Sequence, residues 1–135
     1  MMYPLSAMLF LVLILFVFLF VARMSALYSK KVNLTYFEVF NGTQPPVYLT
    51  KVTNNVNNLF EVPPIFYMAV LLVLLFDIEN ETMLFNAWGF VIARYIHSLV
   101  HITVNNYLMR GGIFTVSIYF LVMLWVALLQ NTPGF

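Results

Sequence analysis

An uncharged apolar run near the start of this sequence constrains its fold more than any other feature. No charged side chain occurs from Pro4 to Ala22, and the run is rich in Leu, Phe and Val. A helix needs about 20 apolar residues to cross the hydrocarbon core of a bilayer. The first four residues are not basic, and the run is longer than the apolar core of a secretory signal peptide. We therefore expect a retained membrane span over about 5–28.

Three further apolar segments predict three more membrane-spanning helices, over about 57–76, 82–107 and 111–130. Pro63 and Pro64 lie near the start of the second of these, where proline either opens a helix or kinks it. The pair Gly111-Gly112 predicts a tight turn between the last two spans. The runs are continuous, unlike the alternating segments of a membrane β-barrel. The sequence thus predicts an all-α membrane protein, a four-transmembrane-helix bundle that forms one domain over 1–135.

Composition supports lipid as the solvent and excludes several kinds of chemistry. The chain is 63% hydrophobic and 8% charged, whereas a soluble domain carries about a quarter charged residues. Its net charge of +1 gives no basic stripe for nucleic acid. There is no Cys, which excludes disulfides, thiolate metal sites and cysteine nucleophiles. Any thiol chemistry must therefore use a thiol that the substrate brings.

The loop cations predict how the bundle sits in the membrane. Lys30, Lys31 and Lys51 lie in a long loop over about 29–56, the segment 77–81 has only acidic charges, and Arg110 follows the third span. Since cytoplasmic loops are enriched in Lys and Arg, we expect the first and third loops in the cytoplasm and both termini on the non-cytoplasmic side. A loop as long as 29–56 is often functional or disordered. No organelle signal is evident, so we expect a bacterial inner membrane.

Ionisable side chains occur inside the predicted spans, where each costs roughly 3 kcal/mol or more at the bilayer centre. Arg94, His97 and His101 follow the spacing i, i+3, i+7 and therefore share one face of a helix, which Asn105 extends. Such groups usually face a bundle interior or a wet cavity.

The predicted topology brings a second polar group to the same depth. Asn58 and Glu61 are three residues apart at the cytoplasmic start of the second span, and Arg23 and Arg110 lie near the cytoplasmic ends of the first and third. Together with the stripe on the third span they predict a mostly positive pocket that contains one carboxylate. Such a pocket suits an anionic ligand that also carries an amine.

Structural explanations of these residues stay open one by one. Glu61 could pair with Arg94 and fix the helix register, and Asn58 could hold two helices together. Arg23 and Arg110 could extend their charged ends to the membrane surface. The convergence of all these residues at one level favours a ligand pocket over a purely structural account.

The two histidines also raise the question of a metal or a haem. His97 and His101 have the i, i+4 spacing of metal ligands, but the glutamate of the zinc-protease motif is absent. Either could be an axial haem ligand, yet the neighbouring Arg94 disfavours a cation at this spot. We therefore predict neither a metal nor a haem.

Two segments carry a resemblance to a known family. Asn58 opens the run NLFEVPPIFY, and Arg94 opens the run RYIHSLVH, which Asn105, Asn106 and Arg110 follow. Together they resemble the MAPEG family, the membrane-associated proteins in eicosanoid and glutathione metabolism. The resemblance covers about 57–114, and the chain length and four-span layout agree with it.

The resemblance implies a homotrimer in which glutathione binds between neighbouring protomers near the cytoplasmic face. It implies a transferase or peroxidase that acts on lipophilic small-molecule electrophiles from the lipid bilayer. The family also contains a non-catalytic lipid-binding member, so a ligand-binding protein on the same scaffold is the alternative.

Roles for single residues follow from the resemblance alone. Glu61 would bind the glutamyl amine of glutathione, Asn58 its backbone, and Arg94 and His97 would supply further contacts. Arg110 would be the catalytic residue that stabilises the thiolate. Two further binding residues match less closely: Arg23 aligns only loosely, and His101 stands where many members have Tyr.

The sequence also departs from the family pattern. Asn54 and Asn55 stand where many transferases of the family have an arginine, and Lys51 could replace that cation. Gly111 follows Arg110 and lacks a hydroxyl that some members use, and Phe114 replaces a Tyr of some members.

Overall fold

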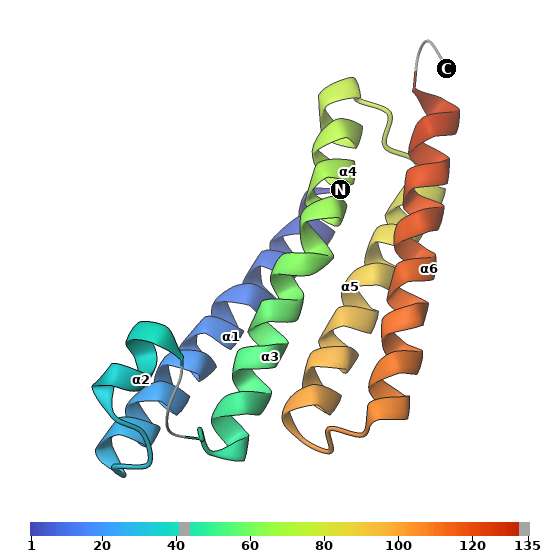
Figure 1. Cartoon of the computed structure of the whole chain (residues 1–135). Helices are drawn as coiled ribbons and strands as arrows, with labels where there is room; N and C mark the ends of the chain where they lie inside the picture. The colour runs from blue at the N-terminus through green and yellow to red at the C-terminus, as the bar shows by residue number, and fades with distance from the viewer. Residues whose placement is uncertain (41–43, 133–135) are drawn as a thin grey trace.

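A computed structural model describes residues 1–40 and 44–132, which form six helices and no strand. The all-helical prediction is confirmed. The columns in Figure 1 are α1, the successive helices α3 and α4, α5, and α6, with the short α2 beside the end of α1. Their bounds are Met2–Tyr28 for α1, Leu34–Val39 for α2, Val47–Glu61 for α3, Pro63–Phe76 for α4, Glu81–Ile102 for α5 and Tyr107–Asn131 for α6.

Three segments of the described chain are long and apolar enough to cross a membrane: Met2–Tyr28, Val47–Phe76 and Tyr107–Asn131. They make this an integral membrane protein. Helix α5 has 22 residues and packs along α6, but it carries polar side chains that it buries within the protein. A crossing by α5, and therefore a fourth span, stays a prediction, as does the side on which the termini lie.

The prediction of a loop over about 29–56 is wrong, because α2 and most of α3 lie within it. Helix α3 is amphipathic: Leu49, Val52, Val56 and Leu59 recur at helical spacing and are buried, while polar side chains occupy its other face. The prediction relied on continuous apolar runs, and a helix that buries only one face does not contain one. The second column therefore spans 47–76 rather than 57–76, and Val62 joins its two helices.

The turn between α5 and α6 also differs from its prediction. Gly111 and Gly112 lie inside α6, and the chain turns at 103–106 instead. Asn105 adopts a left-handed φ of 54° and Asn106 caps α6, its Oδ1 accepting from Met109 N at 3.1 Å. Asparagine tolerates both conformations well. The predicted spans 82–107 and 111–130 thus become 81–102 and 107–131, and the predicted span 5–28 becomes 2–28.

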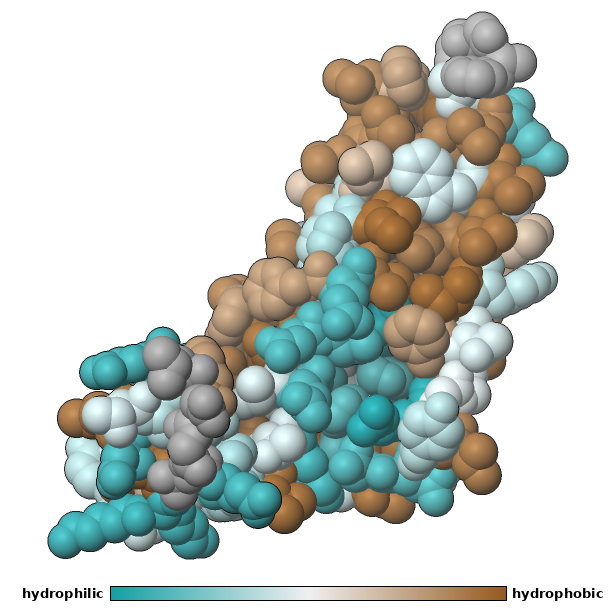
Figure 2. Space-filling view, viewed as in Figure 1, coloured by the Kyte–Doolittle hydropathy of each residue, from teal (hydrophilic) through white to brown (hydrophobic). Residues whose placement is uncertain are grey.

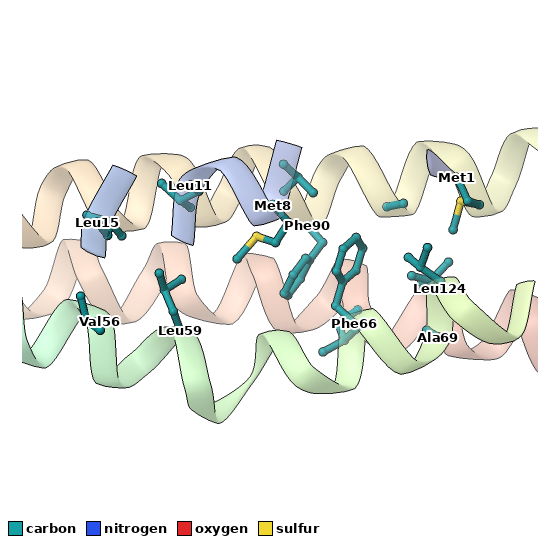
Figure 3. Close-up of a cluster of buried hydrophobic side chains, with 14 of the residues drawn as sticks. Met1, Met8, Leu11, Leu15, Val56, Leu59, Phe66, Ala69, Phe90 and Leu124 are labelled. Atoms are coloured by element: carbon teal, nitrogen blue, oxygen red, sulfur yellow. The ribbon is translucent and has the colours of Figure 1, made fainter. Parts of the chain in front are cut away.

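The apolar core runs along the contacts between the columns (Figure 3). The rings of Phe66 on α4 and Phe90 on α5 stack with centroids 4.7 Å apart, and the Tyr95 hydroxyl donates to Ala7 O at 2.7 Å, which ties α5 to α1. The other large apolar side chains that the figure labels on the five long helices are Met8, Leu11, Leu15, Val56, Leu59 and Leu124.

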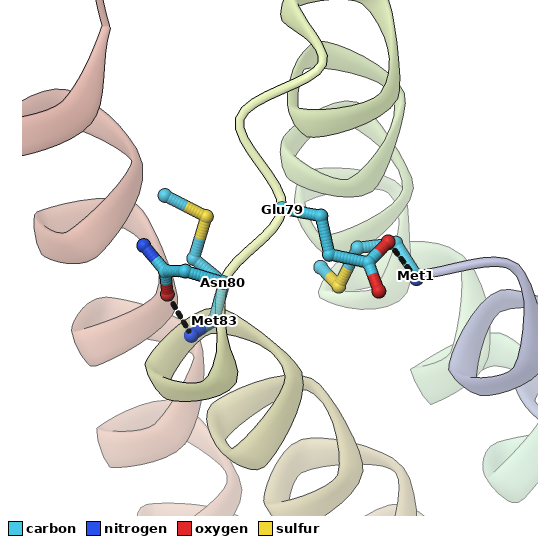
Figure 4. Close-up of polar contacts among 4 residues, drawn as sticks. All are labelled: Met1, Glu79, Asn80 and Met83. Atoms are coloured by element: carbon cyan, nitrogen blue, oxygen red, sulfur yellow. Dashed lines mark hydrogen bonds and ion pairs between the residues drawn. The ribbon is translucent and has the colours of Figure 1, made fainter.

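Polar contacts fix the end of the bundle at the α4–α5 link (Figure 4). The Asn80 side chain caps α5 by accepting from Met83 N at 2.9 Å. The amino group of Met1 forms an ion pair with Glu79, so the start of α1 lies beside this link. This end is opposite the α5–α6 turn.

Gly89 gives a test of the α5–α6 packing. A Cβ at this position would lie 2.5 Å from the Phe120 ring, whereas a Cβ at Gly112 would meet no atom within 4 Å. We expect Gly89→Ala to lower the free energy of unfolding by about 1–3 kcal/mol through overpacking. Gly112→Ala, the matched control, should change it by less than about 1 kcal/mol. Denaturant titration in detergent micelles measures both, and equal effects would contradict the packing.

Candidate functional site

Polar side chains gather over one part of the molecule. In Figure 2 hydrophilic surface extends over α3 and toward the lower part of α6, while the end near α4 is mostly apolar. Many long apolar side chains of α1, among them Phe10, Leu13, Val17 and Phe20, are exposed, which is the expected surface of a helix that faces lipid. The polar region is therefore the place on this protein where a water-soluble ligand could bind.

A cavity of about 250 Å³ lies within this polar region. Three of its lining residues, Asn58, His97 and His101, come from α3 and α5, and Tyr107, Arg110 and Phe114 come from α6. Of the residues that the sequence suggested as binding or catalytic, four thus line one cavity. Gly111 also borders it, and its missing side chain keeps this part of the wall open.

Arg94 lies beside the cavity and connects to it through Asn58. Its side chain is fully buried, and Nη1 donates to Asn58 Oδ1 at 2.8 Å. The guanidinium carbon lies 5.2 Å from the Phe90 ring centre and 5.0 Å from that of Phe114, a cation–π geometry that partly compensates burial. Nε and Nη2 have no hydrogen-bond partner among the described residues. A buried cation whose two donors are unpaired within residues 1–40 and 44–132 could bind an acceptor that a ligand supplies.

Glu61 joins this network at its edge and does not pair directly with Arg94. Asn58 Nδ2 donates to Glu61 Oε2 at 3.4 Å, so Asn58 stands between the cation and the carboxylate. Glu61 is exposed in the described chain. A closed ion pair of Arg94 and Glu61 is therefore not what the structure has, because the intervening amide separates the two charges.

The two histidines form a pair inside the cavity. Both are buried, and their ring centres lie 5.7 Å apart. His97 also packs against Phe114 at 6.1 Å. His101 lies one turn further along α5, closer in sequence to the α5–α6 turn. The pair gives the cavity two groups that can donate or accept protons.

Two hydrogen bonds hold the α5–α6 turn next to the cavity. Arg110 Nη1 donates to Asn105 Oδ1 at 2.7 Å, and Lys51 Nζ donates to Thr103 O at 2.8 Å. Both bonds end on the α5–α6 turn: the first positions Arg110, and the second ties α3 to the turn. Asn105 thus supports the site from the turn and does not extend the stripe on α5 as predicted, because α5 ends at Ile102.

Arg23 lies apart from the cavity within this chain. Its guanidinium carbon sits over the rings of Phe37 and Phe40, at 5.7 and 5.9 Å from their centres. These contacts fasten α2 to α1. Within the described chain, the structure therefore brings Arg23 to α2 rather than to the other predicted binding residues.

Sequence reasoning missed two residues near the site. Tyr107 lines the cavity from the first turn of α6, and the Asn105-Asn106 pair before it is the signal of a helix start that could have placed it there. Asn55 is fully buried on α3, and its Nδ2 donates to Ser98 O at 3.4 Å. It joins α3 to α5 one turn before Asn58, which explains a buried amide at this position.

A comparison with protein families decides what kind of protein carries this site. A model of the MAPEG family matches residues 1–130. This chain belongs to the MAPEG family. The resemblance seen in the sequence covers about 57–114, and outside it the first and last spans resemble the family only in hydropathy. The family match extends to α1 and to nearly all of α6. No curated protein and no solved structure matches the chain.

Membership suggests a role for this membrane protein in eicosanoid or glutathione metabolism. In this MAPEG chain the polar side chains at the cavity lie on α3, α5 and the start of α6, the helices that carry the residues of the resemblance. Among the described residues, no group of three or more His, Asp or Glu side chains is placed to hold a metal ion. The cations at and beside the cavity, Arg110 and Arg94, favour an anionic ligand.

Proposed function

We propose that this MAPEG protein is a glutathione-dependent membrane transferase or peroxidase that acts on lipophilic electrophiles. The observation that supports this most is the single cavity shared by Asn58, His97, His101 and Arg110, with Arg94 bonded to its wall. Glutathione offers carboxylates for the cations and an amine for Glu61, so its charges match this arrangement.

Arg110 has the central chemical role in the proposal. The thiolate of glutathione is the nucleophile, and the pKa of a free thiol is near 8.5. A guanidinium beside the sulfur lowers that thiol pKa because it stabilises the anion. The hydrogen bond from Arg110 to Asn105 holds the guanidinium on the cavity wall, where it would meet the sulfur of a bound tripeptide.

The surroundings of the cavity separate the two substrates. Glutathione would enter from the polar end, and the electrophile would come from the lipid, which concentrates apolar molecules. An apolar cavity of about 340 Å³ lies on another side of α5 and α6, where Ile96, Leu108 and Met109 line it. Apolar surface close to a polar cavity is what a reaction between a water-soluble thiol and a lipid-soluble partner requires.

A homotrimer is part of the proposal. The cavity of one chain, about 250 Å³, lies just below the roughly 300–1,000 Å³ of most small-molecule sites. Glu61 is exposed at its edge, so a neighbouring protomer could close the site there. We expect the trimer in a bacterial inner membrane, with the cavity toward the cytoplasm.

Glutathione binding gives the direct test of the proposal. We expect calorimetry in detergent to show glutathione binding to the wild type, and Glu61→Ala to weaken it by about 10-fold or more, since a hydrogen bond to a charged group contributes about 1.5–3 kcal/mol. Glu38→Ala, which removes a carboxylate on α2, is the matched control and should leave the affinity within about twofold. Equal affinity of wild type and Glu61→Ala would contradict the role of Glu61.

The alternative is a non-catalytic lipid- or ligand-binding protein on the same scaffold. Ultraviolet difference absorbance separates the two functions, because only an activated bound thiol gives a thiolate signal near neutral pH. Binding without that signal, together with no turnover of an aryl halide, would favour the alternative.

A further inference from the structure

His101 lines the cavity, and one of its ring nitrogens has no hydrogen-bond partner among the described residues. It is 3% exposed, and its Nδ1 has no partner among residues 1–40 and 44–132. The ring of His97 packs against that of His101, and it also packs against the ring of Phe114. An unpaired buried nitrogen costs free energy. His101 also lines the cavity, so a bound ligand could supply the missing partner.

The chemistry of the neighbouring groups narrows that explanation. His101 and Arg110 line the same cavity. Arg110 is a permanent cation that can stabilise an anion but cannot accept a proton. An imidazole can accept a proton near neutral pH and return it. The cavity therefore holds one group for a negative charge and one group for a moving proton.

We propose that His101 carries the proton in the hydroperoxide reduction that the proposed function includes. This inference rests on the proposed use of glutathione. In the first step the S–H bond of glutathione breaks, the neutral imidazole of His101 takes the proton, and the electron pair stays on sulfur beside Arg110. The thiolate then attacks the terminal oxygen of the hydroperoxide. A sulfur–oxygen bond forms and the O–O bond breaks.

The same proton completes the reaction. The alkoxide that leaves takes the proton from the imidazolium and becomes an alcohol, and His101 is neutral again. Sulfur is oxidised by two electrons to a sulfenic acid, and the peroxide is reduced by two. A second glutathione condenses with the sulfenic acid to give the disulfide and water. Every proton is accounted for without another oxidant or reductant.

An aryl halide does not need this proton. When the thiolate displaces chloride, the leaving group is a stable anion, and the thiol proton passes to water. Removal of the proton carrier must therefore harm hydroperoxide reduction more than halide displacement. The ratio of the two activities isolates the role of His101 from its effects on glutathione binding, which both reactions share.

His101→Gln is the decisive variant because glutamine keeps hydrogen-bonding atoms but cannot carry a proton at neutral pH. We expect the ratio of kcat/KM for cumene hydroperoxide to kcat/KM for chlorodinitrobenzene, at saturating glutathione, to fall by about 100-fold or more. His97→Gln, one turn away in the same cavity, is the matched control and should change the ratio by less than about threefold. His101→Tyr, which restores the side chain common in the family, should lower the ratio at least about 10-fold, and it provides a second readout if the glutamine variant does not fold.

The outcomes distinguish the two proposals. If His101→Gln lowers both activities equally, or leaves the ratio unchanged, the proton role is wrong while glutathione chemistry stands. If the wild-type protein turns over neither substrate with glutathione, both proposals fail. If His97→Gln lowers the ratio as much as His101→Gln, the assignment to His101 is overturned.

Discussion

Arg110→Ala is expected to remove most glutathione-dependent turnover near neutral pH while the oligomer stays intact. Without the guanidinium, the pKa of the bound thiol should return from about 6.5 to about 8.5, so the thiolate fraction at about pH 7 falls about 25-fold. The variant also loses the guanidinium that stabilises negative charge as it develops in the reaction. The total loss should be about 10²–10³-fold in kcat. Steady-state turnover of an aryl halide measures the effect, with size-exclusion chromatography as the check on assembly.

The dependence on pH makes this prediction specific. Arg110 holds the thiol pKa down, so its contribution to ionisation is large below the free thiol pKa and vanishes above it. The ionisation part of the Arg110→Ala defect should therefore shrink to less than about twofold at about pH 9. Arg110→Lys keeps a charge at the same place and should retain more activity at about pH 7. Full activity of Arg110→Ala at that pH would exclude the thiolate role.

Arg94→Met is expected to weaken glutathione binding without weakening the fold. The Arg94 guanidinium is buried, hydrogen-bonded only to Asn58, and leaves two donors free among the described residues. Burial of a charge without an ionic partner costs folding free energy, and Met removes that cost while it keeps a similar side-chain volume. The apparent Tm of the free protein should stay the same or rise. The Kd for glutathione should rise by about 10- to 100-fold, since a hydrogen bond to a charge contributes about 1.5–3 kcal/mol.

This variant separates a ligand role from a structural one. If Arg94 served mainly to hold α5 against α3, Arg94→Met would lower the Tm. The protein that remains folded would then bind glutathione with an unchanged Kd. Lys30→Met, which removes an exposed cation in the α1–α2 link, is the control for a general loss of positive charge. A lower Tm with unchanged Kd for Arg94→Met would show that the buried cation is a structural element.

Much of the fold followed from the sequence because lipid imposes a simple rule on it. The uncharged run that begins at Pro4 predicted α1, since an apolar segment of that length has few other solutions. Helix α3 escaped the same rule because residues such as Thr50, Lys51 and Asn54 interrupt its apolar side chains. Helix α3, the half of the second column near the site, has polar residues on one face, so its hydropathy is lower than that of α4.

Helical spacing predicted the site residues that lie within one helix. The prediction failed at the turn between α5 and α6. The spacing of His97 and His101 on α5, and of Asn58 and Glu61 on α3, required only a helix, and the structure places these pairs as expected. Tyr107 and the exact position of the α5–α6 turn depended on whether two asparagines or two glycines end the helix. Both pairs are turn residues, so the sequence alone does not choose between them. The structure does, because Met109 N donates to Asn106 Oδ1 and α6 begins there.

The joint at Val62 has a consequence for how the site responds to a ligand. Pro63 and Pro64 have no N–H groups, so the carbonyls of Leu59 and Phe60 receive no i+4 hydrogen bond from them. The column can therefore bend at this level without breaking bonds that a continuous helix would possess. Helix α3, which carries Asn58 and Glu61, is therefore joined to α4 by fewer backbone hydrogen bonds than a continuous helix would have.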